Sequence, residues 1–316
     1  MQVFRKLEDI PADLGLTVAT VGNFDGIHLA HQAVLRAIAT SARQRNARSL
    51  LVTFDPHPMR ILRPDAAPQL LTPLPEKLRL LRDTGVDAVL VLPFSRDLSL
   101  LSPREFAAQI LVQKLRACEV HEGFNFRFGR DAQGDIAALE QLGKEFGFAV
   151  KIYPEMRVRG DVVSSSRIRA LLREGRVARA RRLLGRWFRI VNLPGRGRGY
   201  GHKYTVPTIN LSRYDELTPL DGVYVTGTRI HGEQFQSVTN VGMRPTFGGD
   251  SFAIETHLLH FHPITITAET EVEVSFLYRL RNEIKFPSVE ALRQQIGRDV
   301  QRTEHYFRMT ARDPDE

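Results

Sequence analysis

The first half of the chain alternates short apolar runs with amphipathic stretches. The apolar runs are rich in Val, Ile and Leu, which is typical of buried strands. The predicted strands span residues 18–21, 50–54, 88–92 and 149–153, and the helices predicted between them span residues 33–45, 75–84 and 103–115. Apolar strands separated by amphipathic helices indicate a parallel sheet with helices on both faces. Ligands of such sheets bind beyond the carboxyl ends of the strands.

The pattern changes after Trp187, where strand signals punctuated by Gly and Pro become dominant. The strands predicted in this part span residues 188–193, 222–230, 235–241, 252–259 and 264–274. Many short strands with little helical pattern favour an all-β module, a small barrel. An amphipathic helix is predicted from about Ser288, a suitable N-cap, to about Met309. Residues 167–186 are predicted to form one basic helix, so we expect a first domain over residues 1–186 and a second over residues 187–316.

The composition says more about the possible binding partners of the protein than about its fold. The chain has 316 residues, a net charge of +8 and one cysteine, Cys118. This length suits two domains, and the positive charge favours anionic partners such as nucleic acid, a membrane surface or phosphorylated small molecules. No run of 18 apolar residues occurs, and the first residues do not have the apolar core of a secretory signal. Since a single cysteine fits a reducing compartment, we expect a cytoplasmic protein that does not span a membrane.

The segment VATVGNFDGIHLAH, residues 18–31, joins a predicted buried strand to a helix through a glycine loop. Free backbone N–H groups and the positive end of the helix dipole make such a loop an anion site. His28 and His31 are three residues apart and therefore share one face of the helix. They can be ordinary surface or core histidines, metal ligands together with Asp25, or donors to phosphoryl oxygens. The glycine loop in front of them favours a phosphate ligand such as a nucleoside triphosphate.

A second candidate is the segment of residues 164–169, in which three serines lead into a helix with arginines in its first turn. Serine is a common N-cap of surface helices, and that interpretation stays open. Three hydroxyls together with Arg169 also suit a triphosphate at a helix N-terminus. The basic helix has apolar positions at core spacing and no aromatic residue to stack on bases, which argues against nucleic-acid binding.

The two segments together resemble motifs of the bacterial bifunctional riboflavin kinase/FMN adenylyltransferase family. Its patterns GxFDGxHxGH and SSTxIR are similar to residues 22–31 and 164–169. Further similar segments are FDPHP at residues 54–58, GFNFRFG at 123–129, PTIN at 207–210, NVGMRPT at 240–246, ETHL at 255–258 and RNEIKF at 281–286. The resemblance implies an α/β domain with a nucleotidylyltransferase-type, Rossmann-like parallel sheet, followed by an all-β riboflavin-kinase barrel with a C-terminal helix.

The resemblance also implies two ATP-dependent reactions. The β module phosphorylates riboflavin with MgATP to give FMN and ADP. The α/β module transfers AMP from a second ATP to FMN, which gives FAD and pyrophosphate. The implied partners are flavins and ATP, with Mg²⁺ as cofactor, and neither nucleic acid nor a membrane. We expect a monomer or a weak homo-oligomer.

For adenylyl transfer, the resemblance implies that His28 and His31 are catalytic and stabilise the leaving pyrophosphate. The ATP-binding residues that it implies are Gly22, Phe24, Asp25, Gly26, His28, His31, Ser164, Ser165, Ser166 and Arg169. The flavin-binding residues that it implies are Phe54, Pro56, His57, Pro58 and Asn125.

For riboflavin phosphorylation, the resemblance implies that Glu255 is the base that accepts the proton of the ribityl 5′-hydroxyl. Residues 195–201, rich in Gly and Arg, can form a nucleic-acid segment or a plain hairpin loop, and the resemblance makes them a loop around the ATP phosphates. The implied ATP- and Mg-binding residues are Gly197, Gly199, Gly201, Lys203, Thr208 and Asn210, with Thr208 and Asn210 as metal ligands. The implied flavin-binding residues are Asn240 and Arg281.

The chain departs from the family patterns at a few positions. Ala30 replaces the last glycine of GxFDGxHxGH, Ser166 replaces a threonine, and Ile209 replaces the alanine of PTAN. Residues 201–206 differ most, where the family is closer to GRxLGF. These differences leave open an FMN adenylyltransferase with a weakened kinase module. Two further alternatives are an adenylyltransferase for another phosphorylated substrate, which the β module argues against, and a non-enzymatic nucleic-acid binder.

Overall fold

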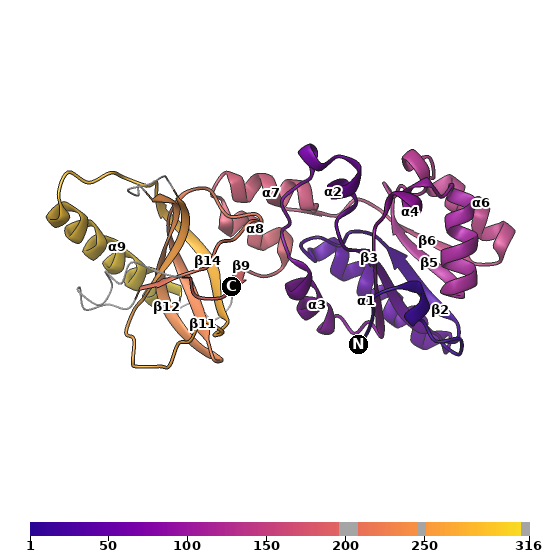
Figure 1. The fold of residues 1–316 in the computed structure, drawn as a ribbon, viewed down its shortest axis with the longest axis horizontal. Helices are drawn as coiled ribbons and strands as arrows, with labels where there is room; N and C mark the ends of the chain where they lie inside the picture. The colour runs from indigo at the N-terminus through magenta and orange to yellow at the C-terminus, as the bar shows by residue number, and fades with distance from the viewer. Residues whose placement is uncertain (196–207, 245–250, 311–316) are drawn as a thin grey trace. The chain divides into compact units, whose positions relative to one another are not determined.

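The computed structural model describes residues 1–195, 208–244 and 251–310. The chain divides into two compact units, Met1–Ser165 and Ser166–Glu316. In Figure 1 the colour runs from indigo to magenta along the first unit and from rose to yellow along the second. The first unit contains a parallel sheet and the second an antiparallel sheet, which confirms the two fold classes predicted from the sequence.

The first unit is built on a six-stranded sheet whose paired strands are all parallel, in the order β1-β4-β3-β2-β5-β6. The strands are β1 (Gln2–Phe4), β2 (Thr17–Val21), β3 (Arg48–Phe54), β4 (Ala88–Leu92), β5 (Ala117–Gly123) and β6 (Ala149–Tyr153). From β2, the chain adds β3 and β4 toward one edge and β5 and β6 toward the other. The strand order therefore reverses between β2 and β5, and the carboxyl ends of these strands mark the expected ligand site.

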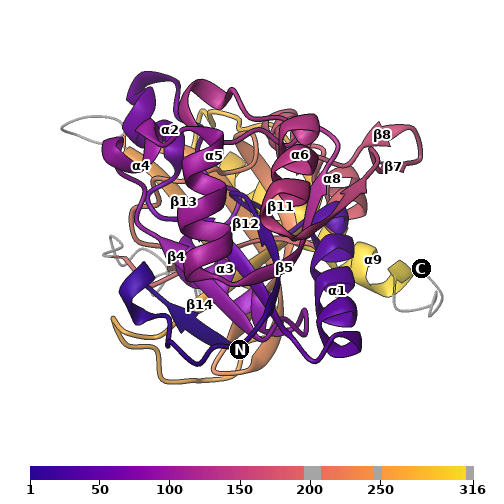
Figure 2. The same ribbon diagram turned by 90° about the vertical axis from the view of Figure 1, so that its right-hand side faces the viewer.

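Helices cover both faces of this sheet. They are α1 (Leu29–Gln44), α2 (Pro58–Leu62), α3 (Leu74–Arg82), α4 (Arg96–Leu100), α5 (Pro103–Phe106) continued by a π-helix (Ala107–Lys114), and α6 (Ile136–Phe146). One core cluster joins α1 and α3 to Val18 and Leu51, and the other joins α5 and α6 to Ala19 and Leu50. Adjacent strand residues point to opposite faces, so the clusters lie on opposite faces. Figure 1 shows α3 and α6 on opposite sides of the strands, and in Figure 2 α5 and α6 lie in front of them.

Several short elements complete the first unit. They are 3₁₀ turns at Leu7–Asp9, Pro64–Ala66 and Arg130–Ala132 and a small hairpin of β7 (Arg157–Val158) and β8 (Asp161–Val162). The sequence analysis did not predict β1 and β5. The strand β5 was missed because it contains three polar residues, Glu119, His121 and Glu122, which are all buried inside the sheet. A strand with this many polar residues lacks the continuous apolar run by which buried strands are found.

Two helices precede the barrel: α7 (Ser165–Arg173) and α8 (Val177–Leu184). The single helix predicted over residues 167–186 is therefore wrong. Gly175 separates the two helices with a left-handed φ of 72°, which glycine adopts without a steric penalty. A Cβ atom at this position would lie 2.5 Å from Cδ of Arg279, so a larger residue would force Arg279 to move.

The second unit contains a six-stranded antiparallel sheet in the order β10-β13-β12-β11-β14-β9. The strands are β9 (Phe188–Asn192), β10 (Thr208–Asn210), β11 (Gly222–Ile230), β12 (Glu233–Arg244), β13 (Ser251–Leu258) and β14 (Val272–Arg281). A bridge between Pro194 and Leu211 joins the segments that follow the two edge strands, so the sheet curls back on itself like a barrel. The helix α9 (Val289–Thr310) follows, close to its predicted bounds. No helix in the described ranges is long and apolar enough to cross a membrane.

The strand predicted over residues 264–274 is wrong in its extent, because β14 begins at Val272 and continues to Arg281. Residues 264–271 have the β-branched alternation of a strand, but Thr267 and Thr270 close a turn there. The Thr270 N–H donates to the Thr267 carbonyl over 3.1 Å, and the Thr267 N–H donates to the Thr270 hydroxyl over 2.9 Å. Local pattern alone did not separate this turn from the strand that follows.

Five hydroxyl side chains form a closed ring inside the second unit. Hydrogen bonds of 2.7 to 3.1 Å connect Thr226, Ser237, Thr228, Thr256 and Thr239 in that order, and Thr239 connects back to Thr226. All five residues are fully buried on strands β11, β12 and β13. Each hydroxyl has two hydroxyl neighbours, so the ring satisfies its own polar groups without charge.

Candidate functional site

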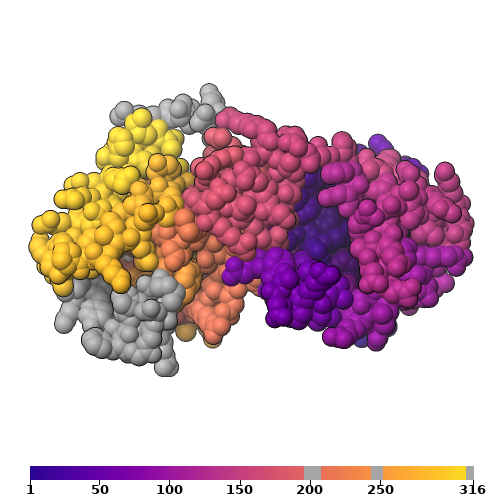
Figure 3. Space-filling view, turned by 90° about the horizontal axis from the view of Figure 1, so that it is seen from above, coloured from indigo at the N-terminus to yellow at the C-terminus, as the bar shows by residue number. Residues whose placement is uncertain are grey.

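The glycine loop, residues 22–27, follows β2 where the strand order reverses. Gly22 donates its N–H to the Val52 carbonyl on β3 over 2.9 Å. Phe24, Gly26 and Ile27 have positive φ values of 44°, 88° and 39°. Left-handed residues in a short loop turn its N–H groups inward, which is how such loops surround anions. The space-filling view in Figure 3 shows the indigo N-terminal residues and the purple residues that follow them on this face of the molecule.

Helix α1 begins directly after the glycine loop, and His28 is its N-cap. The Nδ1 atom of His28 accepts the N–H of His31 over 3.3 Å, which satisfies one of the open donors of the first turn. The two imidazole rings are stacked with centroids 3.5 Å apart, and the His31 ring lies 4.5 Å from the Phe24 ring. The structure therefore brings Phe24, His28 and His31 together at the positive end of the α1 dipole.

Asp25 fastens the glycine loop to a distant part of the chain. Its carboxylate accepts the N–H groups of Leu71 and Thr72 at 3.0 Å and the Thr72 hydroxyl at 3.2 Å. The Thr72 oxygen in turn accepts the N–H of Gly26 at 2.9 Å. Asp25 is only 2% exposed. These contacts give Asp25 a structural role in the loop, whereas contact with ATP stays a prediction.

The serine segment reaches the same loop. Ser165 is the first residue of α7, and its hydroxyl donates to the Asp25 carbonyl oxygen over 2.8 Å. Two motifs that are 140 residues apart in the sequence are thus in contact within the first unit. Ser164 precedes this contact, while Ser166 and the buried Arg169 follow on α7 and belong to the second unit.

Lys77 on α3 is a buried cation that the sequence analysis did not assign to the site. Its Nζ donates to the Asn23 carbonyl in the glycine loop over 2.7 Å and to the Thr53 hydroxyl over 3.3 Å. Burial lowers the pKa of Lys77, and the charges of Asp25 and Asp55 oppose this shift. The only signal in the sequence was a lysine beside the apolar stripe of a short helix.

The predicted flavin-binding residues lie on loops at the carboxyl ends of β3 and β5. Phe54 is the last residue of β3, and Pro56 follows two residues later. His57 is the N-cap of α2, with its Nδ1 accepting the Met59 N–H over 3.2 Å and Pro58 at the first helical position. Asn125 follows β5 and is exposed. Both segments therefore lie at the carboxyl end of the parallel sheet, on either side of the glycine loop that follows β2.

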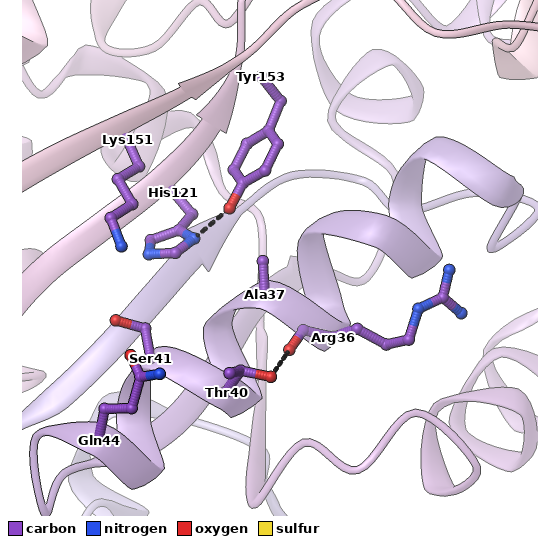
Figure 4. A pocket seen from close by; sticks show the side chains of 8 residues that line it. All are labelled: Arg36, Ala37, Thr40, Ser41, Gln44, His121, Lys151 and Tyr153. Carbon is purple, nitrogen blue, oxygen red and sulfur yellow. Dashed lines mark hydrogen bonds between the residues drawn. The ribbon is translucent and has the colours of Figure 1, made fainter.

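A pocket of about 390 Å³ lies on the α1 side of the first unit (Figure 4). Ser41, His121 and Lys151 line it, and all three bind the fully buried carboxylate of Glu119, at 2.8, 2.5 and 3.0 Å. Nδ1 of His121 is 2.8 Å from the Tyr153 hydroxyl. Burial alone would raise the pKa of Glu119, but the hydrogen bonds from His121, Lys151 and Ser41 lower it to about 2. This cluster joins α1, β5 and β6, and it explains how β5 tolerates an ionised residue.

In the second unit, three predicted kinase residues lie in one row across neighbouring strands. Asn210 on β10 pairs with Glu255 on β13, and Glu255 pairs with Asn240 on β12. Paired residues on adjacent strands point to the same face, and their Cβ atoms lie about 5 Å apart. The neighbours of Glu255, Ile254 and Thr256, are buried, whereas Glu255 is half-buried. Asn210, Glu255 and Asn240 therefore share the more open face of the sheet.

Two other kinase residues have structural partners. The Thr208 hydroxyl lies 3.4 Å from Nδ1 of His257. Arg281 binds the buried carboxylate of Asp299 on α9 with two donors, at 2.9 and 2.8 Å, so it fastens α9 to β14. Its contact with flavin stays a prediction.

The remaining kinase assignments concern Gly197, Gly199, Gly201 and Lys203, and these residues lie outside the described part of the chain. The structure adds Glu283, which the sequence analysis did not assign. Its carboxylate accepts the Asn240 side-chain amide over 3.1 Å.

The oxygen donors on β10 and β13 fit Mg²⁺. This ion prefers oxygen ligands and keeps several waters and phosphate oxygens, so one or two protein oxygens suffice. Thr208 and Asn210, two residues apart on β10, supply a hydroxyl and an amide carbonyl, and Glu255 on β13 is paired with Asn210. Among the residues that the structure describes, no group of three His, Cys, Asp or Glu side chains could hold a metal ion.

Two protein families match the two halves of the chain, and proteins that combine both families match nearly all of it. Residues 10–167 match the FAD synthetase family, and residues 184–307 match the riboflavin kinase family. The bifunctional riboflavin kinase/FMN adenylyltransferase of Escherichia coli K12 is 34% identical over 294 residues, which are 93% of this chain and 93% of that protein. The protein of the same name from Pseudomonas fluorescens is 36% identical over 301 residues, 95% of this chain and 96% of its own.

A solved structure is also similar over nearly the whole chain. It is described as a macrolide-efflux protein from Streptococcus pneumoniae, and it matches with a TM-score of 0.85 and 29% identity over 96% of this chain and 98% of that one. The two family matches follow one another along the sequence, as the two sheets do in the structure. We conclude that this chain belongs to the bifunctional riboflavin kinase/FMN adenylyltransferase family.

Proposed function

We propose that the glycine loop with His28 and His31 binds ATP for adenylyl transfer, and that Glu255 is the base for riboflavin phosphorylation. The chain makes FAD in two steps, because it contains both the FAD synthetase and the riboflavin kinase sequences. ATP phosphorylates riboflavin to FMN, and FMN then receives AMP from a second ATP, which releases pyrophosphate. The stacked histidine pair at the start of α1, where the strand order reverses, is the observation that supports this assignment best.

In adenylyl transfer, a phosphate oxygen of FMN attacks the α-phosphorus of ATP, and the bond to pyrophosphate breaks. Negative charge grows on the leaving pyrophosphate. The N–H groups of the glycine loop, the α1 dipole and the imidazoles of His28 and His31 stabilise this charge. The reaction needs no covalent enzyme intermediate, because positioning and charge neutralisation supply the rate enhancement. The ATP site also includes Gly22, Phe24, Asp25, Gly26, Ser164, Ser165, Ser166 and Arg169, and the flavin site consists of Phe54, Pro56, His57, Pro58 and Asn125.

In riboflavin phosphorylation, the oxygen of the ribityl 5′-hydroxyl attacks the γ-phosphorus of ATP while Glu255 accepts the hydroxyl proton. The bond from the γ-phosphorus to the bridging oxygen breaks, and ADP leaves. Asn210 and Asn240 flank Glu255 on the same face and orient the reacting groups. Thr208 and Asn210 would hold Mg²⁺, which neutralises phosphate charge when bound. The ATP site is completed by Gly197, Gly199, Gly201 and Lys203, and the flavin site by Asn240 and Arg281.

Single substitutions in the full chain separate the two sites. We expect His28→Ala to lower FMN adenylylation about a hundredfold, because one preorganised donor contributes about 3 kcal/mol to the transition state. Riboflavin phosphorylation should be unchanged in this variant. Glu255→Gln should lower riboflavin phosphorylation and spare the adenylylation of supplied FMN. Chromatography of riboflavin, FMN and FAD after incubation with ATP and Mg²⁺ measures both steps.

The matched control for Glu255→Gln is Glu233→Gln, an exposed carboxylate on the neighbouring strand β12. This control should retain both activities. A His28→Ala or Glu255→Gln variant that loses both steps equally contradicts the assignment of one reaction to each half. Supplying riboflavin without FMN also tests the alternative of an adenylyltransferase with a weakened kinase module, which the riboflavin kinase match over residues 184–307 disfavours.

We assign the enzyme to the cytoplasm, as a monomer or weak homo-oligomer whose partners are flavins and ATP rather than nucleic acid. The single cysteine of the sequence supports a reducing compartment. A gel-shift assay with duplex and single-stranded nucleic acid tests the partner assignment. Tight, salt-sensitive binding would contradict it.

A further inference from the structure

A buried carboxyl occupies the point where β2 and β5 separate. The backbone ladder between these strands extends to the pair Ala19 and Val120. Beyond it, the N–H of Val21 donates to Oε1 of Glu122 over 2.6 Å, so a side chain replaces the backbone acceptor that the next residue of a strand would supply. Glu122 is 4% exposed. The last N–H before the glycine loop is therefore held by Glu122.

The surroundings of Glu122 favour its neutral form. Glu122 shares a sheet face with Val120, and the core cluster on that face is apolar, with Phe106, Ile110 and Phe128 among its members. Burial raises the pKa of the Glu122 carboxyl well above its usual range, and the Val21 N–H and the Thr20 hydroxyl only partly oppose this shift. No charged side chain in the described part of the chain contributes to it.

The Thr20 hydroxyl is the second polar neighbour of the Glu122 carboxyl. The Thr20 hydroxyl is buried, and its oxygen has no hydrogen-bond partner among the described residues. It lies close enough to Glu122 to influence the carboxyl pKa. A protonated carboxyl can accept the Val21 N–H with one oxygen and donate its own proton to Thr20 with the other. A carboxylate could instead accept the Thr20 hydroxyl proton, so burial in the apolar cluster, and not the number of hydrogen bonds, favours the neutral form.

Glu122 also connects the two loops of the proposed adenylyl-transfer site. Val21 leads directly into Gly22 and the glycine loop, and Glu122 leads directly into Gly123 and the loop that contains Asn125. These loops leave neighbouring strands on the two sides of the position where the strand order reverses. A change in the Glu122 side chain would therefore alter the start of both loops at once.

We propose that Glu122 is a positioning residue for adenylyl transfer, whose neutral carboxyl holds the Val21 N–H and thereby sets the course of the glycine loop. This inference rests on the proposed ATP site at residues 22–31. Glu122 does not touch the reacting atoms in this proposal. It acts through the backbone that carries the N–H donors, so a small displacement of Val21 is passed directly to Gly22.

Three variants of the full chain test this role. Glu122→Gln keeps an acceptor for Val21 and a donor for Thr20, so it should retain FMN adenylylation within about twofold at neutral pH. Glu122→Leu keeps the volume and removes the acceptor of the Val21 N–H, so Val21 and the glycine loop that follows it should shift. The variant should therefore lower kcat/KM for ATP in this step about tenfold or more. Riboflavin phosphorylation in the same molecules serves as the internal reference and should not change.

Thr17→Val is the matched control for damage to the sheet. Thr17 lies at the opposite end of β2, and its buried hydroxyl donates to the Leu115 carbonyl over 2.7 Å. The substitution should reduce thermal stability, as we also expect for Glu122→Leu, without a comparable loss of adenylylation. Adenylylation that is unchanged in Glu122→Leu, or lost equally in Thr17→Val and Glu122→Leu at equal stability, overturns the proposal.

The pH profile gives a readout that does not depend on whether Glu122→Leu folds. As the pH rises through the raised pKa of Glu122, ionisation places a charge without a cationic partner in the apolar cluster below both loops, so wild-type adenylylation should decline on the alkaline side. Glu122→Gln cannot ionise and should lack this decline. Identical profiles contradict the proposed role of the neutral carboxyl. A His28→Ala variant that retains adenylylation would instead show that the ATP site itself is misplaced.

Discussion

Asp25 shows at the residue scale how one carboxylate can fix a catalytic loop. Its partners, Leu71 and Thr72, donate to it from a segment far along the chain. We expect Asp25→Asn to lower the free energy of unfolding by about 2 kcal/mol, because an amide meets these donors with one acceptor and turns its own donors toward them. The KM for ATP in adenylylation should rise, and riboflavin phosphorylation should not change. Urea unfolding and separate assays of the two steps measure these effects.

An Asp25→Asn variant with lower stability and unchanged adenylylation would show that the glycine loop keeps its course without this anchor. The motif predicts that Asp25 belongs to the site, yet the sequence gave no indication of its hydrogen-bond partners. Lys77 presents the same difficulty, since its acceptors Asn23 and Thr53 come from two other segments. Spacing within one motif predicts which side chains share a helix face, as with His28 and His31, but contacts between distant segments depend on the assembled sheet.

At the scale of elements, β5 gathers the polar groups inside the first sheet and makes it sensitive to acid. The pKa of Glu119, lowered to about 2, means that its stabilising contribution is complete above the ordinary carboxyl pKa of 4.5 and is lost as the pH falls toward 2. Burial also lowers the pKa of His121, so protonation of this ring below its ordinary pKa of 6.5 costs further stability. We expect the unfolding free energy of the wild type to fall more steeply below pH 4.5 than that of Glu119→Gln.

Glu145→Gln is a suitable control for this experiment, because Glu145 forms an exposed ion pair with Arg104. Its pH dependence should follow the wild type. If Glu119→Gln also follows the wild type, the Glu119 cluster does not govern acid stability.

The strands β2 and β5 show how far a sequence pattern can predict this sheet. The apolar run of β2 was predicted as a strand, whereas the polar β5 was not. The polar residues of β5 are stable only with partners on α1, β2 and β6, which no local pattern reveals.

At the scale of the whole molecule, α8 and nearly all of α7 belong to the second unit, together with the barrel strands. Helix α8 contacts β9 and β14, and the N–H of Leu220 donates to the Leu172 carbonyl of α7 over 2.9 Å. We expect a fragment of residues 166–316 to fold and to phosphorylate riboflavin. A fragment of residues 187–316 should unfold at lower urea concentration, because it loses the buried side chains of both helices, such as Leu171 and Leu183. Urea unfolding and product chromatography compare the two fragments.

Equal stability of the two fragments would support the boundary near residue 187 that the sequence predicts. That result would also indicate that α7 and α8 only connect the two domains and do not stabilise the barrel. The overall organisation, a parallel sheet followed by a curled antiparallel one, was predictable because strand and helix periodicity change once, near Trp187. The exact division was not predictable, because the apolar stripes of α7 and α8 show that these helices are buried without showing against which sheet.

The ring of Thr226, Ser237, Thr228, Thr256 and Thr239 orders its protons in one sense, because the Thr239 hydroxyl donates to Thr256 and this fixes the direction of the other four bonds. In this sense each oxygen gives one proton and receives one, and the O–H dipoles circulate so that they largely cancel. The Ser237 hydroxyl also lies 3.0 Å from the Thr226 carbonyl oxygen, which it reaches as a donor. The centre of the second unit is thus polar but has only a small net dipole. Charge on the open face, such as that of Glu255, then shapes the local field with little interference from the interior beneath it.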